Sequence, residues 1–407
     1  MRVLTMWLYG RVVGELEQLR TARLRLRFTE DALSTYGFGA RPLSLSLPLT
    51  DKRVQGDALE RFCDNLLPEG TVRAVLEREH SIRPGDAFAL LARIGGECAG
   101  AIQFTTGDDS VGNGRLTPLT EDDVDEIVRD LPTHQARDGL EVSASLGGIQ
   151  DKVLLTQTGE GWAWPSAGAM STHLIKPEPI STQVVVPQII RYEHWALRLA
   201  ADAGLPAASA DLQTFAGREA LVVERFDRRD GRRTHQEDFT QALGLAARDK
   251  YESSTGDHRL AALAARAAPE ALDPGAFRSE LLAQVTFNAA IGNGDAHSKN
   301  YSVRISRSAN VSMTPLYDVA PVFLVAPRLR HAGHAVNEQV YLPDVTAEHL
   351  ITEGKRWGLP AENATTVVRD TLLALVRSAE RLGDPDVEIP VAEAVRDRAL
   401  ALLAPLS

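Results

Sequence analysis

The chain has 407 residues and a mass of 44.2 kDa, enough for two or three domains that each bury their own core. Its 44 lysine and arginine residues against 55 aspartate and glutamate residues give a net charge of −11, which argues against a nucleic-acid-binding protein that relies on overall positive charge. No apolar run approaches the roughly 20 residues that span a bilayer, and the first residues show no export signal. Two cysteines are too few for a disulfide framework, so a cytoplasmic location without membrane contact is expected.

The first third of the chain is predicted to be rich in β-strands. Alternation of apolar and polar side chains predicts strands at residues 3–9, 12–13, 24–28 and 43–49. Apolar residues from Leu59 to Leu67 recur at helical spacing instead, and they predict an amphipathic helix that ends at Pro68.

The rest of the chain changes character twice. A polar stretch at residues 132–139 indicates a boundary, after which short strands alternate with one helix whose apolar stripe runs from Tyr192 to Ala203. Beyond Gln236 the pattern becomes helical, for example at residues 260–268, 281–291 and 368–382. The expected units are a β-rich module (1–135), a small α/β lobe (136–230) and a helical lobe (231–407).

The segment with the most polar functional groups is Asn293–Asn300, which follows an apolar helical stretch. Asp295 is followed five residues later by Asn300, the spacing of a protein-kinase catalytic loop, in which the aspartate accepts the proton of the substrate hydroxyl and the asparagine helps to hold magnesium. His297 and Lys299 lie between them. Taken alone, the pattern is weak, and a polar turn that caps helices is the better interpretation until other segments are considered.

Two further segments favour the kinase interpretation. Asp318, between hydrophobic residues, would supply the second carboxylate that a Mg·ATP site requires, although an aspartate before an apolar run can also be a helix cap. Lys176 ends a strand-like run, where the lysine of a kinase reaches the α- and β-phosphates. A solvated lysine at a strand end has the same local sequence.

Two other segments could contact a nucleotide. The strand-like residues 221–227 break abruptly into charge, as at a hinge whose backbone pairs with adenine, or at an ordinary edge strand. The glycine-containing turn at residues 145–152 could cradle phosphate with its backbone N–H groups. It is not a Walker A loop, because no Gly-Lys-Ser/Thr follows at the required spacing.

In their order along the chain, these segments resemble the HipA family of bacterial serine/threonine kinase toxins. The resemblance covers nearly the whole chain and rests on WLYGRVVGEL, FCDNLLPEG, SLGGIQDK, HLIKPE, ERFD, NGDAHSKN and LYDVAP. It implies an α+β, two-lobed protein-kinase-like fold related to phosphoinositide kinases. An extra β-rich N-terminal subdomain and an all-helical C-lobe are also expected.

The resemblance also implies a role for particular residues. Asp295 resembles the catalytic base, Asn300 and Asp318 the magnesium ligands, Lys176 the ATP-phosphate lysine, and Ser145 the serine that family members autophosphorylate. The other residues expected to contact the nucleotide are Leu146, Gly147, Gly148, Glu224, Phe226, His297 and Lys299. Many relatives have Ala or Pro at the position of Gly147, which suggests a more mobile loop here. Glu193 is a candidate partner of Lys176.

The function implied by the resemblance is ATP- and Mg²⁺-dependent phosphorylation of a serine or threonine hydroxyl. The expected substrate is a translation-related protein such as an aminoacyl-tRNA synthetase. The expected partner is a small helix-turn-helix, HipB-like antitoxin that connects the chain to operator DNA. Two alternatives remain: a catalytically weak ATP-binding corepressor, and a kinase of a small metabolite. The intact set of site residues weighs against the first, and the N-terminal module weighs against the second.

Overall fold

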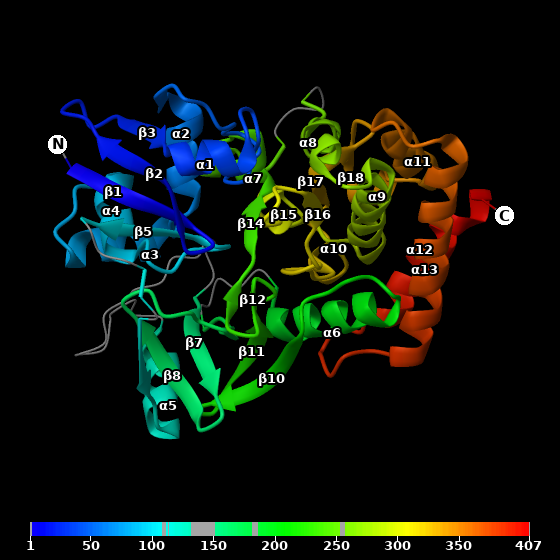
Figure 1. Cartoon of the computed structure of the whole chain (residues 1–407). Coiled ribbons are helices and arrows are strands. Elements are labelled where there is room, and N and C mark those ends of the chain that lie inside the picture. Colours follow the sequence, from blue (N-terminus) through cyan, green and yellow to red (C-terminus); the bar gives the residue numbers. More distant parts are fainter. Residues whose placement is uncertain are drawn as a thin grey trace.

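The N-terminal part of the chain forms an antiparallel five-stranded sheet in the order β4-β3-β2-β1-β5 (blue and cyan in Figure 1). The computed structural model describes residues 2–107, 111–112, 114–131, 151–180, 186–252 and 257–406. The strands of this sheet are β1 (Arg2–Leu8), β2 (Arg11–Gln18), β3 (Leu24–Phe28), β4 (Val54–Gln55) and β5 (Ile102–Thr106). Alternate side chains, such as Leu4, Met6 and Leu8, are fully buried because the two-residue period places them on one face.

Helices cover this buried face. They are α1 (Glu30–Tyr36), α2 (Asp57–Asn65), α3 (Gly70–Glu79) and α4 (Ala87–Ile94). The predicted amphipathic helix is confirmed as α2, which buries Leu59, Phe62 and Cys63. The N-terminal module therefore has its own core, made by one sheet face and the apolar stripes of its helices.

The strand predicted at residues 43–49 is wrong. The four leucines of this segment are all buried, as their period required, but the segment forms turns. The Ser44 hydroxyl accepts a hydrogen bond from the Ser46 N–H, and the Leu47 N–H donates to the Ser44 carbonyl. Side-chain hydrogen bonds of this kind compete with strand pairing.

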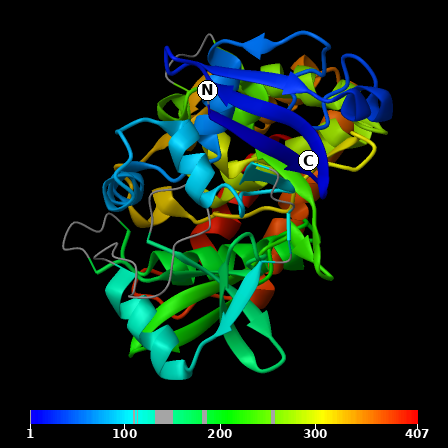
Figure 2. The ribbon, with the colours of Figure 1, turned by 60° about the vertical axis from the view of Figure 1, so that its left-hand side comes forward.

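A second antiparallel sheet of six strands has the order β10-β11-β9-β7-β8-β6. Its strands are β6 (Arg115–Pro118), β7 (Val153–Thr158), β8 (Gly161–Ser166), β9 (His173–Pro177), β10 (Ala210–Phe215) and β11 (Arg218–Glu224), and its helices are α5 (Glu121–Asp130) and α6 (Ile189–Asp202). Figures 1 and 2 show this green lobe on the opposite side of the molecule from the start of the chain.

The boundary expected at residue 135 lies outside the described residues, but β6 and α5 already belong to the second lobe. β6 pairs with β8, and Val124, Ile127 and Val128 of α5 pack in one core with Val153 and Leu155. The N-terminal module therefore ends, and the second lobe begins, before Arg115, earlier than the sequence predicted.

The third lobe is mainly helical (Figure 1). Its helices are α7 (Phe239–Leu243), α8 (Arg259–Ala267), α9 (Pro274–Ile291), α10 (Val322–Val325), α11 (Ala347–Arg356), α12 (Ala361–Leu382) and α13 (Ala392–Leu403). The expectation of a purely helical lobe misses its small sheets. These are formed by β12 (Arg228–Arg229) with β13 (Arg232–Arg233), by β14 (His235–Asp238), β15 (Ser302–Ile305) and β16 (Val311–Met313), and by β17 (His331–Val336) with β18 (Gln339–Tyr341).

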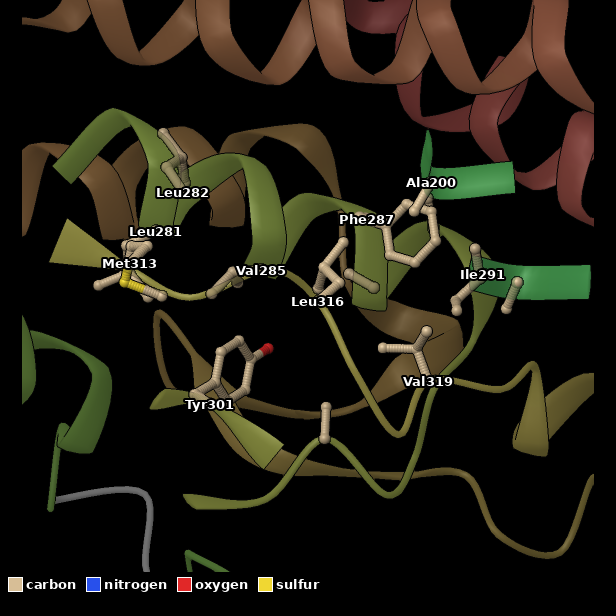
Figure 3. Close-up of a cluster of buried hydrophobic side chains, with 14 of the residues drawn as sticks. Ala200, Leu281, Leu282, Val285, Phe287, Ile291, Tyr301, Met313, Leu316 and Val319 are labelled. Atoms are coloured by element: carbon tan, nitrogen blue, oxygen red, sulfur yellow. The ribbon is translucent and has the colours of Figure 1, made fainter. Parts of the chain in front are cut away.

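Helix α9 lies at the centre of this lobe. Asp273 caps its N-terminus by accepting hydrogen bonds from Gly275 and Ala276, and Pro274 occupies the first helical position. Figure 3 shows its buried side chains, including Leu281, Val285 and Phe287, among residues of the neighbouring strands and loops. The chain that follows α9 is thus held on a rigid, fully packed helix.

No helix in the described part of the chain combines the length and the apolar character needed to cross a membrane.

Candidate active site

Lys176 lies near the end of β9, an interior strand of the second sheet. Its ammonium group is 2.8 Å from Glu193 Oε1 on α6 and 2.8 Å from Asp318 Oδ1 in the third lobe. Burial alone would lower the pKa of Lys176, but the two carboxylates raise it above its ordinary value, so the side chain stays charged. The predicted pairing of Lys176 with Glu193 is confirmed, and the same ammonium connects the two lobes.

Asp318 is fixed by its buried neighbours. Leu316 and Val319 are each 1% exposed, and the Leu316 N–H donates to the Pro206 carbonyl at 2.8 Å. The backbone of Asp318 has φ +54°, a left-handed conformation that is uncommon for non-glycine residues but that aspartate adopts more readily than most. Burial acts to raise the pKa of Asp318, but Lys176 outweighs it and lowers the value to about 2, so the carboxylate is ionised.

The catalytic-loop candidate starts where α9 ends. Gly292 has φ +75°, the left-handed conformation that commonly ends a helix. The Asp295 N–H then donates to the Asn293 side-chain oxygen, and the Asn300 side-chain N–H₂ donates to the Asp295 carbonyl at 2.8 Å. Asp295 and Asn300, predicted from their spacing, are therefore held in one loop.

The Asp295 carboxylate has two aromatic neighbours. The Tyr251 hydroxyl donates a hydrogen bond to Asp295 Oδ1, and His297 Nε2 lies 3.9 Å from the same oxygen. Burial, with a further contribution from Lys250, lowers the pKa of His297 to about 4, so this imidazole is neutral at pH 7. Burial raises the pKa of Asp295, and the hydrogen bond from Tyr251 acts in the opposite direction.

Lys299 connects the loop to the N-terminal module. Its ammonium lies 3.1 Å from Asn65 Oδ1 at the end of α2, 3.3 Å from Asp238 Oδ2 and 3.4 Å from Glu69 Oε1. Burial opposes its charge, but Asp238 and Glu69 raise its pKa overall. Lys299 lies at the predicted site, with its charge already neutralised by protein groups.

These residues line one cavity of about 920 Å³, within the size range of nucleotide and cofactor sites. Nine of the predicted or candidate residues lie in its wall, namely Lys176, Glu193, Glu224, Phe226, Asp295, His297, Lys299, Asn300 and Asp318. Asn300 and Asp318 present amide and carboxylate oxygens to the same space, the donor atoms that Mg²⁺ prefers. Within the described ranges, no group of three or more His, Cys, Asp and Glu side chains is arranged to hold a metal ion.

The predicted hinge lies where β11 ends. Glu224 is exposed at the cavity wall, and the Phe226 ring lies 5.7 Å from that of Tyr317. Arg225 and Asp227, which also reach the cavity wall, take part in a buried ionic cluster with Arg228 and with Glu97 of the N-terminal module. The sequence could not show this role, because Glu97 is 128 residues from Arg225.

Two other residues of the wall were missed. Lys152 lies close enough to Lys176 for the two positive charges to repel each other. Burial, and to a smaller extent this repulsion, lowers the pKa of Lys152 to about 8. Its place at the end of the glycine-containing turn was the available signal. Tyr251 had none, since it lies 44 residues before Asp295. Ser145, Leu146, Gly147 and Gly148, also predicted for this site, fall outside the described residues.

Comparisons with known proteins agree with this architecture. Residues 4–105 match the family described as HipA N-terminal domain, and residues 144–379 match the HipA-like C-terminal domain. Y4mE of Sinorhizobium fredii, whose name describes an inferred kinase, is 34% identical over 94% of this chain and 93% of its own length. The serine/threonine-protein kinase toxin HipA of Shewanella oneidensis is 30% identical over 90% of this chain and 87% of its own.

A solved structure extends the likeness to three dimensions. The complex of HipA, HipB and operator DNA from Shewanella oneidensis contains a chain that matches with a TM-score of 0.79 and 27% identity, covering 98% of this chain and 96% of that one. Both domains and their order along the sequence are thus shared with proteins of one family over almost the full length. The chain belongs to the HipA family, and it is a kinase.

Proposed function

We propose that the chain is an ATP- and Mg²⁺-dependent serine/threonine protein kinase and the toxin of a toxin–antitoxin pair. The observation that carries the proposal is the pairing of Lys176 with both Glu193 and Asp318 in the cavity that also holds Asp295 and Asn300. A charged lysine, an ionised carboxylate and a second acid in one cavity match the parts of a phosphoryl-transfer site. The family membership supports the same assignment.

In this mechanism, Lys176 binds the α- and β-phosphates, and Glu193 keeps its ammonium in place. Glu224 and Phe226 would contact the adenine. Lys299, held by Asn65, Asp238 and Glu69, anchors the loop that carries Asp295, and His297 lies beside that carboxylate. Asn300 and Asp318 would hold Mg²⁺, which supplies positive charge to the phosphate oxygens. Asp295 orients the acceptor hydroxyl and takes its proton as the hydroxyl oxygen bonds to the γ-phosphorus and the bond to the β-phosphate oxygen breaks.

The finer parts of the proposal concern partners and organisation. The substrate is a translation-related protein such as an aminoacyl-tRNA synthetase in the cytoplasm, and a HipB-like helix-turn-helix antitoxin connects the chain to operator DNA. The relative found in a complex with HipB and its operator supports this partner. The functional units are an N-terminal module that ends before Arg115, a nucleotide-binding lobe that continues to about residue 230, and a helical lobe over 231–407.

The test is phosphoryl transfer by purified protein, measured by mass spectrometry after incubation with Mg·ATP. We expect Asp295→Asn and Asp318→Asn each to lower the rate by a factor of about 100 or more, since one removes the base and the other a magnesium ligand. Asp370→Asn, at an exposed position on α12, is the matched control and should leave the rate unchanged. Full activity in Asp318→Asn would contradict the assignment of the site, and phosphorylation of metabolites alone would contradict the protein substrate.

Ser145 is the proposed site of autophosphorylation and of self-inactivation. Phosphorylation would add about −1.5 to −2 charges at pH 7, and Asp295 and Asp318 would repel them from the cavity. ATP should therefore bind the phosphorylated protein more weakly than it binds Ser145→Ala. Equal affinities in an ATP titration of the two forms would reject this switch, even if phosphoserine were found.

A further inference from the structure

Tyr251 makes a direct contact with the proposed base. Its hydroxyl donates to Asp295 Oδ1, and its ring forms part of the cavity wall with 45% of the side chain exposed. Among the described residues, the other carboxylate oxygen, Oδ2, accepts no side-chain or backbone hydrogen bond that would compete with a substrate. One oxygen of the base is thus occupied by a protein hydroxyl, and one is left for a substrate.

The backbone on both sides of Tyr251 is tied to other elements. The Lys250 carbonyl accepts from the Ser298 N–H at 3.0 Å, within the catalytic loop. The Glu252 N–H donates to the Gly333 carbonyl at 3.0 Å, and the Glu252 carboxylate accepts from the Ala335 N–H at 3.0 Å, both in β17. Tyr251 is therefore fixed between the catalytic loop and β17.

Among the residues that the structure describes, Asp295 is the hydrogen-bond partner of the Tyr251 hydroxyl. The His297 ring stands edge-on to it at 4.9 Å between centroids, and that imidazole is neutral, so it does not compete with Tyr251 as a charged donor to Asp295. Lys250 lies on the face of the Tyr251 ring, 5.9 Å from its centroid, and forms an ion pair with Glu69. The hydroxyl of Tyr251 is thus directed to the base.

We propose that Tyr251 is a positioning residue for phosphoryl transfer: its hydroxyl holds Asp295 through Oδ1, so that Oδ2 is presented to the acceptor hydroxyl. The inference rests on the proposed function, in which Asp295 is the base. A carboxylate without this hydrogen bond would rotate more freely about its side-chain torsions, and fewer encounters with the acceptor would have the reactive geometry.

Tyr251→Phe tests the proposal because it keeps the ring and removes only the hydroxyl. A hydrogen bond to a charged group contributes enough that kcat should fall roughly 10- to 100-fold, while the KM values for ATP and for the acceptor and the melting temperature stay the same. Tyr341→Phe is the matched control, because it removes an exposed tyrosine hydroxyl from the adjacent β18. It should change neither kcat nor KM.

Three results would overturn the inference. If kcat and both KM values are unchanged in Tyr251→Phe, the hydroxyl has no role in the reaction. If kcat is unchanged but the KM for the acceptor rises, Tyr251 contributes to substrate binding instead. If the melting temperature falls and the amount of active protein falls in proportion, the role of the hydroxyl is structural. If wild-type protein transfers no phosphate, the proposed function fails and the positioning role fails with it.

A measurement without turnover tests the contact itself. In protein labelled with ¹³C at tyrosine Cζ, with the Tyr251 signal assigned from Tyr251→Phe, Asp295→Ala should shift that signal because it removes the acceptor. If the wild-type protein is an active kinase and the Tyr251 signal does not change in Asp295→Ala, the inference is overturned. A shifted signal in a protein that transfers no phosphate would instead locate the failure in the proposed function.

Discussion

Glu237 is a buried acid at the contact between the N-terminal module and the rest of the chain. It is 1% exposed, and its Oε1 accepts a 2.7 Å hydrogen bond from the Leu45 N–H. Burial raises the pKa of Glu237 to about 8, against the opposing effect of hydrogen bonds from Ser44 and Leu45. The carboxyl is therefore largely protonated at neutral pH.

This raised pKa predicts a specific pH dependence of stability. The folded state keeps a proton on Glu237 at pH values where the unfolded state has already lost it. The contribution of Glu237 to the free energy of unfolding is therefore complete below about pH 4.5 and is lost as the pH rises toward 8. The loss is at most about 1.4 kcal/mol per pH unit. We expect the melting temperature of wild type to fall between pH 6 and pH 8.5 more than that of Glu237→Gln. Glu348→Gln, at an exposed position on α11, should behave as wild type. Parallel pH profiles for wild type and Glu237→Gln would contradict the prediction.

At this scale, the sequence could identify residues that the structure brings together in one cavity. Lys176, Asp295, Asn300 and Asp318 stand in a fixed order within short motifs, and the structure brings them to one cavity. It could not identify Tyr251, because the role proposed for this residue depends on a contact with Asp295, 44 residues away in the sequence. Single residues without a motif become visible only when folding brings their partners close.

Close packing of the catalytic loop against β17 has a testable consequence at the scale of elements. A Cβ atom on Gly333 would lie 2.4 Å from the Ala296 carbonyl oxygen and 2.6 Å from the His297 nitrogen, both backbone atoms that cannot rotate away. We expect Gly333→Ala to move the loop and to lower the phosphorylation rate at least about tenfold, since small displacements of catalytic groups are costly. Gly159→Ala is the control, because no heavy atom lies within 4 Å of a Cβ there. Wild-type activity in Gly333→Ala would show that the loop tolerates displacement.

Elements with a clear period were predicted well, and those set by local hydrogen bonds were not. Helix α2, helix α6 and strand β1 follow directly from apolar spacing. At residues 43–49 the period correctly gave burial but not conformation, because Ser44 forms hydrogen bonds within its own turn. Strands β16 and β18 of the helical lobe have three residues each, too few to show a period.

At the scale of the whole molecule, Glu97 connects the N-terminal module to the hinge. It is fully buried, and its Oε1 lies 2.9 Å from Arg225 and 3.2 Å from Arg228. Burial opposes ionisation, but the surrounding arginines lower the pKa of Glu97 below its ordinary range. The sequence predicted both the module and the hinge, but not the ion pairs that connect them.

Removing this charge should therefore destabilise the protein strongly. Glu97→Gln removes a carboxylate that pairs with Arg225, Arg228 and Arg233, and Asp227, which pairs with two of them, cannot balance all three charges. We expect a loss of about 3–5 kcal/mol in the free energy of unfolding measured with urea. Arg23→Ala, which breaks an exposed ion pair, should cost less than about 1 kcal/mol. A similar small loss in both variants would mean that the cluster does not hold the module to the hinge.

Expression in cells tests the proposed partnership. The chain alone should slow growth, and a small helix-turn-helix protein encoded beside it should restore growth. Asp295→Asn is the control and should not slow growth on its own. With a net charge of −11, the isolated chain should bind operator DNA weakly, so tight, salt-sensitive binding by the chain alone would contradict the need for a partner.

The wide separation along the sequence of the residues that build the cavity also affects when activity can arise. A ribosome makes the chain from its N-terminus, so Asn65 is present early, whereas Lys299 and Asp318 come much later. Helix α9, which precedes the loop with Asp295, packs against α12 and α13, which are made after that loop (Figure 1). An unfinished chain therefore lacks the assembled cavity, and fragments from interrupted translation should be inert. The proposed toxic activity should therefore arise only after α12 and α13 have been made and have packed against α9.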